Sequence, residues 1–309
     1  MDAVTWAVQR KVWQTKWRGD GLAMDTFWTY ARDIDRYQTW CSEQSVQSTA
    51  LSSGRAYVDH VLCSKSRHAA RHAARALKAY GKYLVWDEMC PPTPGLEPHK
   101  DSGPFQRLTL PKEPPVVNAP TATDDDLEKL LAACTPSNSV SARSWEVLRD
   151  KAIITTLAFT GMRRGEVAGM TLDDVDLLAG TVRIPKTKNN EVRNVKLNSE
   201  VVRAILRYHT ASQDDRPEHE RGLWMSAHDM SPLKPGGISQ MLYRRAQAAG
   251  VGVAAHAFRR RQAGEWMARG GSESGLMTNN GWKSPTMILR YSKAKAEANA
   301  MAESERLFG

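Results

Sequence analysis

Two arginines and a tyrosine in the second half of the chain have the types and spacing that phosphodiester chemistry requires. Arg163 precedes Glu166 in the run T-G-M-R-R-G-E, and Arg259 follows His256 by three residues. A phosphodiester undergoing displacement spreads negative charge over its non-bridging oxygens, and a guanidinium can meet two of them, whereas a lysine acts as a point charge. An isolated arginine is usually a surface residue or an ion-pair partner. The interpretation of Arg163 and Arg259 as phosphate-binding residues therefore depends on their spacing to Tyr291.

Tyr291 is the candidate nucleophile. A tyrosine hydroxyl has a pKa of about 10, so it attacks poorly until nearby cations and a base help to remove its proton. Attack on phosphorus would give a phosphotyrosyl bond that keeps the energy of the broken linkage, and the strand could be rejoined without ATP. The alternative is a tyrosine that packs on the core beside Met287 and Ile288, and we assign that role to every other tyrosine.

The polar segments, taken in order, resemble the tyrosine recombinases of the phage integrase family. That family has the pattern T-G-[LM]-R-x-x-E, a lysine in a β-hairpin, H-x-x-R, G-[HW] and a tyrosine nine residues later. Here Tyr291 lies nine residues after Trp282 and 32 residues after Arg259, at family spacing. One tetrapeptide would carry little weight, but five ordered elements are specific, and the resemblance covers residues 20–309.

The resemblance implies a role for a lysine in the predicted hairpin. Lys188 corresponds to the general acid that protonates the departing 5′ oxygen, and a mobile loop would let it enter the site after DNA binds. Lys186 lies two residues away, on the same face of a strand, and stays an alternative. We favour Lys188 because it stands five residues before Arg193, in the family's order of lysine, hairpin and arginine.

Three further residues complete the implied site. His256 can assist proton transfer near neutral pH, although a histidine at a helix start is more often a cap or a core residue. Trp282 stands where most members have histidine and a minority have tryptophan, whose indole N–H can donate to a phosphate but cannot shuttle a proton. Glu166 would support Arg163 as an ion-pair partner.

The elements that must position these residues are mainly α-helical, with a small β-sheet. Thr123 and the three aspartates after it predict a capped helix start, and Trp145–Phe159 is an apolar helix that ends before the arginine motif. Residues 181–185 and 191–197 alternate in β fashion around a polar tip, which predicts a hairpin. The resemblance implies an α+β tyrosine-recombinase catalytic domain at residues 123–309.

The first part of the chain is predicted to form a helical domain over residues 20–90, which the resemblance identifies as a core-binding (SAM-like) DNA-binding domain. Its helix Ser66–Trp86 has apolar residues on one side and five cations on the other. No acidic residue lies between these cations, whereas solvated faces normally alternate Glu with Lys. We therefore predict phosphate contacts for this basic stripe, which comprises Arg67, Arg71, Arg75, Lys78 and Lys82.

Proline marks the boundary between the two domains. Nine of the 15 prolines lie in residues 91–122, which predicts a linker that could carry the chain around a duplex. Residues 1–19 are expected to be an N-terminal extension.

Composition excludes several classes of protein. Hydrophobic residues make up 41% and charged residues 25% of the chain, so it is neither disordered nor collagen-like. It has no apolar run long enough for a membrane span and no signal peptide, so we expect a cytoplasmic protein. Four cysteines without C-x-x-C spacing indicate no disulfide framework and no cysteine zinc site, and we expect no metal site. The net charge of +9 favours a polyanionic partner.

These observations predict a site-specific recombinase that cuts and rejoins double-stranded DNA through a 3′-phosphotyrosyl intermediate, in phage or mobile-element integration and excision. No cofactor, metal or ATP is expected. Joining two duplexes needs four protomers, and the resemblance implies that the amphipathic tail, residues 295–308, docks in a neighbouring subunit. Host or phage proteins that bend DNA would be further partners. Two alternatives stay open: a type IB topoisomerase with a similar catalytic set, and a non-catalytic DNA-binding regulator, against which the complete set of residues argues.

Overall fold

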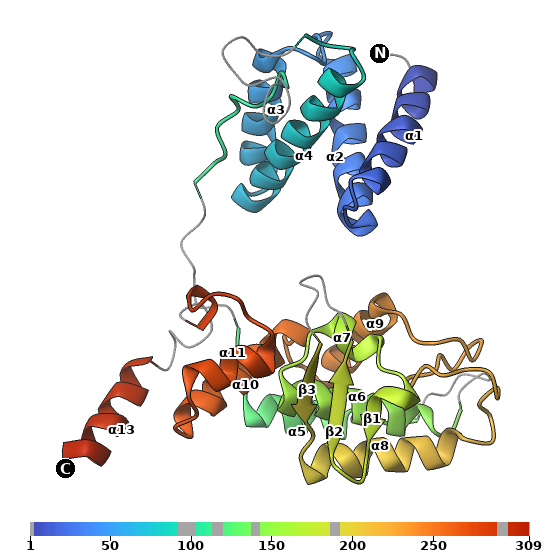
Figure 1. Ribbon diagram of the computed structural model, residues 1–309, viewed down its shortest axis with the longest axis vertical. Coiled ribbons are helices and arrows are strands. Elements are labelled where there is room, and N and C mark those ends of the chain that lie inside the picture. The colour runs from blue at the N-terminus through green and yellow to red at the C-terminus, as the bar shows by residue number, and fades with distance from the viewer. Residues whose placement is uncertain are drawn as a thin grey trace. The chain divides into compact units, whose positions relative to one another are not determined.

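The structure is a computed structural model that describes residues 3–91, 103–112, 120–136, 143–185, 192–288 and 296–308. The chain divides into two units, residues 1–117 and 118–309 (Figure 1). The expected fold class is confirmed, because helices dominate both units and a three-stranded sheet lies in the second. Within the described residues, no helix is both long enough and apolar enough to cross a membrane.

The described part of the first unit is a helical bundle. Its helices are α1 (Ala3–Gly19), α2 (Met24–Glu43), α3 (Leu51–Ser64) and α4 (Arg67–Trp86). Helix α4 packs against both α2 and α3, and its small buried residues Ala70, Ala73 and Ala74 leave room for them. The Ser66 side chain accepts a hydrogen bond from the Ala69 backbone N–H at 3.2 Å and so caps the start of α4.

Helix α1 belongs to the core of this unit. Trp6, Trp13 and Trp17 are buried, and Trp13 lies edge-on against Phe27 with ring centroids 5.1 Å apart. Spacings of seven and four residues place the three indoles on one side of the helix. The boundary predicted at residue 20 leaves α1 outside the helical domain, whereas the burial of its tryptophans makes it part of that domain's core.

Part of the predicted linker packs on the first unit. Phe105 and Leu108 are buried in the unit's core. Gly54 and Gly81 make room for the Phe105 ring, since a Cβ would lie 2.8 Å from it at the first position and 3.1 Å at the second. The linker prediction is therefore corrected for residues 103–112, because burial of these apolar side chains anchors the segment to the bundle.

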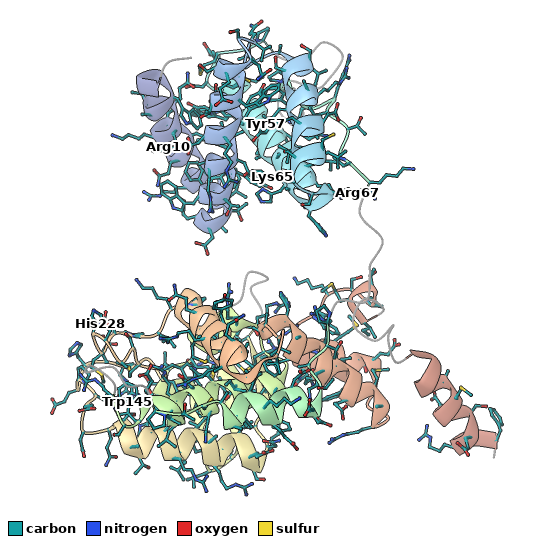
Figure 2. All side chains as sticks on the ribbon, turned by 180° about the vertical axis from the view of Figure 1, so that it is seen from behind. Arg10, Tyr57, Lys65, Arg67, Trp145 and His228 are labelled. Carbon is teal, nitrogen blue, oxygen red and sulfur yellow. The ribbon has the colours of Figure 1, made fainter. Side chains whose placement is uncertain are left out.

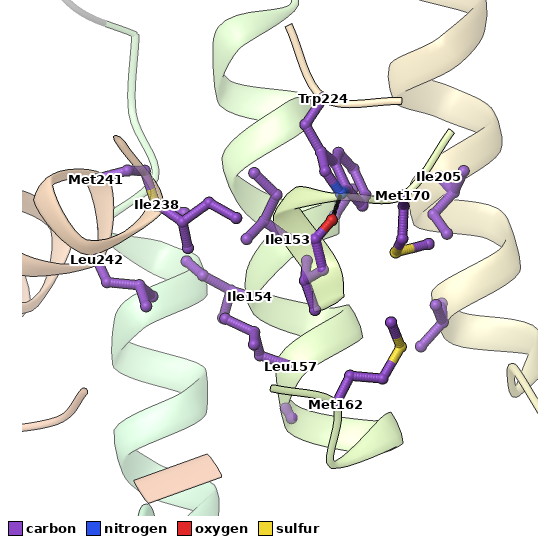
Figure 3. Close-up of a cluster of buried hydrophobic side chains, with 14 of the residues drawn as sticks. Ile153, Ile154, Leu157, Met162, Met170, Ile205, Trp224, Ile238, Met241 and Leu242 are labelled. Atoms are coloured by element: carbon purple, nitrogen blue, oxygen red, sulfur yellow. Dashed lines mark hydrogen bonds between the residues drawn. The ribbon is translucent and has the colours of Figure 1, made fainter. Parts of the chain in front are cut away.

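The second unit is built around helix α6 (Glu146–Thr160). Its other described elements are α5 (Asp124–Ala132), α7 (Arg164–Ala168), η1 (Leu172–Asp174), β1 (Val175–Asp176), β2 (Thr181–Ile184), β3 (Arg193–Lys196), α8 (Ser199–Ser212), α9 (Pro235–Ala249), α10 (Ala255–Ala268), α11 (Glu273–Asn280) and α13 (Ala296–Phe308). Figure 3 shows Ile153 and Leu157 of α6 among apolar side chains of α8 and α9. Inside this core the Trp224 indole N–H donates a hydrogen bond to the Val167 carbonyl at 2.7 Å, so its polar atom is satisfied.

The sheet carries the predicted hairpin. Its strands are antiparallel in the order β1-β2-β3, and Val182 pairs with Val195 while Ile184 pairs with Arg193. The valines and Ile184 are buried, so the alternation read in the sequence correctly gave both strands. The predicted hairpin tip, residues 186–191, lies outside the described residues.

Candidate active site

The arginine motif follows a left-handed turn at the end of α6. Gly161 has a φ of 67°, a conformation that glycine adopts without strain. A Cβ at Gly161 would lie 2.7 Å from the Asn280 side-chain oxygen, so the available space also requires glycine. The turn places Arg163, in extended conformation, immediately before α7.

Glu166 holds Arg163 in place. Its Oε1 accepts a hydrogen bond from Arg163 Nη1 at 2.8 Å, and its Oε2 accepts one from the Arg163 backbone N–H at 2.7 Å. Arg163 Nη2 also donates to the Gly281 carbonyl at 3.2 Å. The Arg163 side chain is still 38% exposed, so it has accessible surface on which a phosphate could bind.

The Glu166 carboxylate is buried yet favours its ionised form. Burial is the largest single influence and opposes the charge, but hydrogen bonds from Arg193 and Arg163 together with the Arg193 charge outweigh it. The pKa of Glu166 therefore lies below its ordinary value of 4.5. At neutral pH this carboxylate is charged and pairs with both guanidiniums.

Arg259 ties two helix ends together from α10. Its side chain is buried, and its guanidinium donates hydrogen bonds to the carbonyl oxygens of Gly161 and Asn280. Its Cζ atom lies 5.2 Å from the centre of the Trp282 ring, within cation–π distance. The end of α6, which leads to Arg163, is thereby joined to the end of α11, which leads to Trp282.

His256 lies on the first turn of α10, one turn before Arg259. Desolvation and then the charges of neighbouring arginines, led by Arg260, lower the pKa of His256 below its ordinary value of 6.5. The imidazole therefore favours its neutral form, which can accept a proton.

One cavity brings the predicted residues together. Arg163, His256 and Arg259 line a cavity of about 660 Å³, together with Arg164 and Tyr243. These side chains come from the start of α7, from α9 and from α10, and the cations give the cavity a positive lining. In the described part of the chain, no three His, Cys, Asp or Glu side chains lie close enough together to hold a metal ion.

Trp282 is the predicted residue that follows α11. Its side chain is buried, and it comes directly after Gly281, which ends α11 in a left-handed conformation with φ 59°. The remaining predicted residues, Lys188 and Tyr291, lie outside the described residues, as does the alternative Lys186.

Arg193 is a site residue whose contacts the sequence did not reveal. In the sequence, Arg193 indicated only the register of the hairpin lysine. In the structure, the Arg193 side chain is 8% exposed and its Nη2 pairs with Glu166 Oε2 at 2.7 Å. The signal was present in the strand pattern, because Arg193 shares a strand face with the buried Val195. An arginine on a buried face needs an acidic or carbonyl partner.

The basic stripe lies on α4, with Arg67 on its first turn (Figure 2). Arg67, Arg75 and Lys82 are exposed, whereas Arg71 is half-buried and donates a hydrogen bond to the Pro111 carbonyl. The stripe is therefore not uniform, since one of its members also fastens the 103–112 segment to the bundle.

A second cavity, of about 500 Å³, lies beside the stripe. Its lining combines aromatic side chains with cations from two helices, α1 and α4, and the cations are Lys16, Arg75, Lys78 and Lys82. Lys16 is paired with Asp20 at 3.0 Å and lies over the Trp86 ring at 4.9 Å. Helix α1 thus adds Lys16 to the basic surface, which we predicted from α4 alone.

Comparisons with known proteins identify the family of this chain. A model of the phage integrase family matches residues 121–298. Tyrosine recombinase XerC of Azotobacter vinelandii is 26% identical over 194 residues, which cover 61% of this chain and 58% of the relative. Tyrosine recombinase XerD of Pseudomonas aeruginosa is 26% identical over 203 residues, which cover 64% and 62%. The chain thus spans about 60% of the length of these curated relatives.

Solved structures share the fold. An integrase of the Tn1549 transposon, in complex with transposon right end DNA, superposes with a TM-score of 0.69 at 17% identity, covering 97% of this chain and 99% of that chain. A lambda integrase dimer bound to a core site gives a TM-score of 0.66 at 14% identity, covering 96% and 78%. Because the family model matches more than half of the chain, this protein belongs to the phage integrase family of tyrosine recombinases.

Proposed function

We propose that this protein is a site-specific recombinase that cuts and rejoins double-stranded DNA through a 3′-phosphotyrosyl intermediate. The observation that carries the proposal is the cavity in which Arg163, His256 and Arg259 meet, although 93 residues separate the first from the second. Two guanidiniums and a neutral imidazole around one cavity suit a phosphodiester whose charge increases during displacement. The family match supports the same chemistry.

In the proposed reaction the Tyr291 hydroxyl oxygen attacks the scissile phosphorus. The bond from phosphorus to the 5′ oxygen breaks, and Lys188 gives that oxygen a proton, leaving a 5′ hydroxyl and a 3′-phosphotyrosyl end. His256 accepts the tyrosine proton, while Arg163 and Arg259 bind the non-bridging oxygens. The reverse attack, by the 5′ hydroxyl of another strand, completes recombination without ATP.

The basic stripe is proposed to bind the DNA backbone. Arg67, Arg75 and Lys82 are exposed, and the acid-free spacing allows them to contact successive phosphates. Lys16 extends this surface from α1. Such contacts would fix the position of the protein on the duplex, whereas base contacts would choose the site.

We further propose that four protomers assemble on two duplexes during phage or mobile-element integration and excision in the cytoplasm. The curated relatives are named XerC and XerD, and one solved neighbour is a transposon integrase. The exposed Met301 and Phe308 of α13 would be covered when this helix docks in a neighbouring protomer. DNA-bending proteins of the host or phage would help to shape the assembly.

Mapping of covalent adducts tests the function. Incubation with a randomised supercoiled DNA library, followed by denaturation, should leave DNA attached to the protein at one sequence. Tyr291→Phe should still bind DNA and yield no adduct, because the attacking oxygen is gone. Tyr243→Phe removes a described tyrosine that lines the cavity, and its adduct should persist.

Three results would contradict the proposal. An adduct that survives in Tyr291→Phe would show that another residue attacks. Relaxation at many sequences without joining of two duplexes would instead identify a topoisomerase. Binding without any adduct in the unaltered protein would indicate a regulator.

A further inference from the structure

Arg193 lies where three segments of the second unit meet. It is the first residue of β3, and its two terminal nitrogens donate to the Glu166 carboxylate at 3.1 and 2.7 Å. Its Nε donates to the Asn279 carbonyl, near the end of α11, at 2.9 Å. One side chain therefore connects the hairpin, the Glu166 carboxylate and the last turn of α11.

The end of α11 is fitted closely around this guanidinium. A Cβ at Gly281 would lie 3.0 Å from Arg193 Nη1 and 3.6 Å from Arg163 Nη1. Gly281 adopts φ 59° and directly precedes Trp282. The left-handed glycine thus lets the backbone approach both arginines, which fixes the path of the chain toward Trp282.

Arg163 makes hydrogen bonds of its own to Glu166. Glu166 binds Arg163 through the guanidinium at 2.8 Å and through the backbone N–H at 2.7 Å, and neither hydrogen bond involves Arg193. By contrast, Arg193 is the side chain of β3 that reaches both Glu166 and Asn279. Loss of Arg193 should therefore free the first residue of β3 from Glu166 and Asn279 more than it displaces Arg163.

We infer that Arg193 is a positioning residue for the general acid. It anchors the first position of β3, the strand that follows the segment containing Lys188, against the carboxylate that holds Arg163. This anchor sets where the hairpin begins relative to the phosphate-binding arginines. The inference rests on the proposed function, since it assigns Arg193 an effect on proton donation to the 5′ oxygen.

The test uses the full-length protein and a duplex that carries the cleavage site mapped above. Two versions of the duplex differ at the scissile position: one has the ordinary 5′ oxygen and the other a bridging 5′ sulfur. A thiolate leaves without a proton, whereas an alkoxide needs one, so the sulfur substrate bypasses the general acid. Lys188→Ala provides the reference for a loss that sulfur restores.

Arg193→Gln should cleave the oxygen substrate about 100-fold more slowly than the unaltered protein, as expected for a misplaced catalytic group. On the sulfur substrate most of that loss should disappear, as for Lys188→Ala. Arg193→Lys keeps the charge and should recover part of the rate. Arg183→Gln is the matched control, because Arg183 is an exposed arginine on the adjacent strand, and it should cleave both substrates normally.

The outcomes separate this inference from the proposed function. Equal losses on both substrates, with an active unaltered protein, would overturn the role of Arg193 in proton donation. Normal cleavage of both substrates by Arg193→Gln would overturn it as well. Failure of the unaltered protein to cleave either substrate while still binding it would overturn the proposed function itself. Thermal melting of each variant identifies a loss that comes from unfolding.

Discussion

The arginines of the two units are held in different ways. On α4 the cations occupy one helix face, backed by buried alanines and aromatic residues, and Arg67 and Arg75 are exposed. In the second unit Arg259 is buried and the Arg193 side chain is 8% exposed, and both are bonded to carbonyl or carboxylate oxygens. A row of exposed cations attracts a polyanion through the number of its charges. Buried guanidiniums act instead through the fixed direction of their hydrogen bonds. Substitutions that keep charge but change shape should therefore affect the two units differently.

The largest expected effect comes from Arg259→Lys. Lysine cannot donate to the Gly161 and Asn280 carbonyls while presenting a planar fork to a phosphate, so the cleavage rate should fall by about 100- to 1,000-fold. Arg75→Lys on α4 is the matched change, and it should leave both cleavage and affinity nearly unaltered. Single-turnover cleavage and gel-shift titrations measure the two quantities. Similar losses in both variants would contradict the distinction between the units.

A smaller effect is expected along the stripe. The logarithm of the DNA-binding constant falls with the logarithm of salt concentration, with a slope of about −0.9 per phosphate contact. Arg67→Ala and Lys82→Ala should each flatten that slope by about one contact. Arg36→Ala on α2 removes an exposed charge that pairs with Asp33 and should leave the slope unchanged. Unchanged slopes in the stripe variants would show that these cations are ordinary surface residues that make no phosphate contact.

The smallest effect concerns His256. Its pKa in the folded protein lies below the ordinary 6.5, so the unfolded chain binds more protons between these two values. Stability should therefore be complete above pH 6.5 and fall as pH drops through this window. Urea unfolding of His256→Gln should show a weaker decline, whereas His228→Gln, at an exposed position (Figure 2), should behave like the unaltered protein. A decline that is identical in all three proteins would remove His256 as its source.

The sequence predicted elements whose signals are local. The alternation in β2 and β3 gave the hairpin strands. The ordered polar segments indicated Arg163 and Glu166, which the structure joins by a hydrogen bond, and Arg259, which lines the same cavity as Arg163. Helix α1 was missed as a core element, although its tryptophans recur at helical spacing, because basic residues lie between them.

What the sequence could not supply were partners distant along the chain. Arg193 bonds to Glu166, 27 residues earlier, and to Asn279, 86 residues later, and no local pattern specifies such pairs. The proline content of residues 91–122 predicted a linker, and this signal was stronger than that of the apolar pair Phe105 and Leu108. Their spacing of three residues was the one signal that the segment is packed.

The shared carboxylate of Glu166 couples the effects of substitutions at three positions of the second unit. Two guanidiniums depend on one acidic partner, so the free-energy cost of losing Arg163 or Arg193 depends on whether Glu166 is present. Substitutions among these three positions will not add, and a chain that has lost Glu166 gains little from restoring either arginine alone. Changes that preserve all three residues, or replace them together, are therefore expected to cost less than a change at one of them.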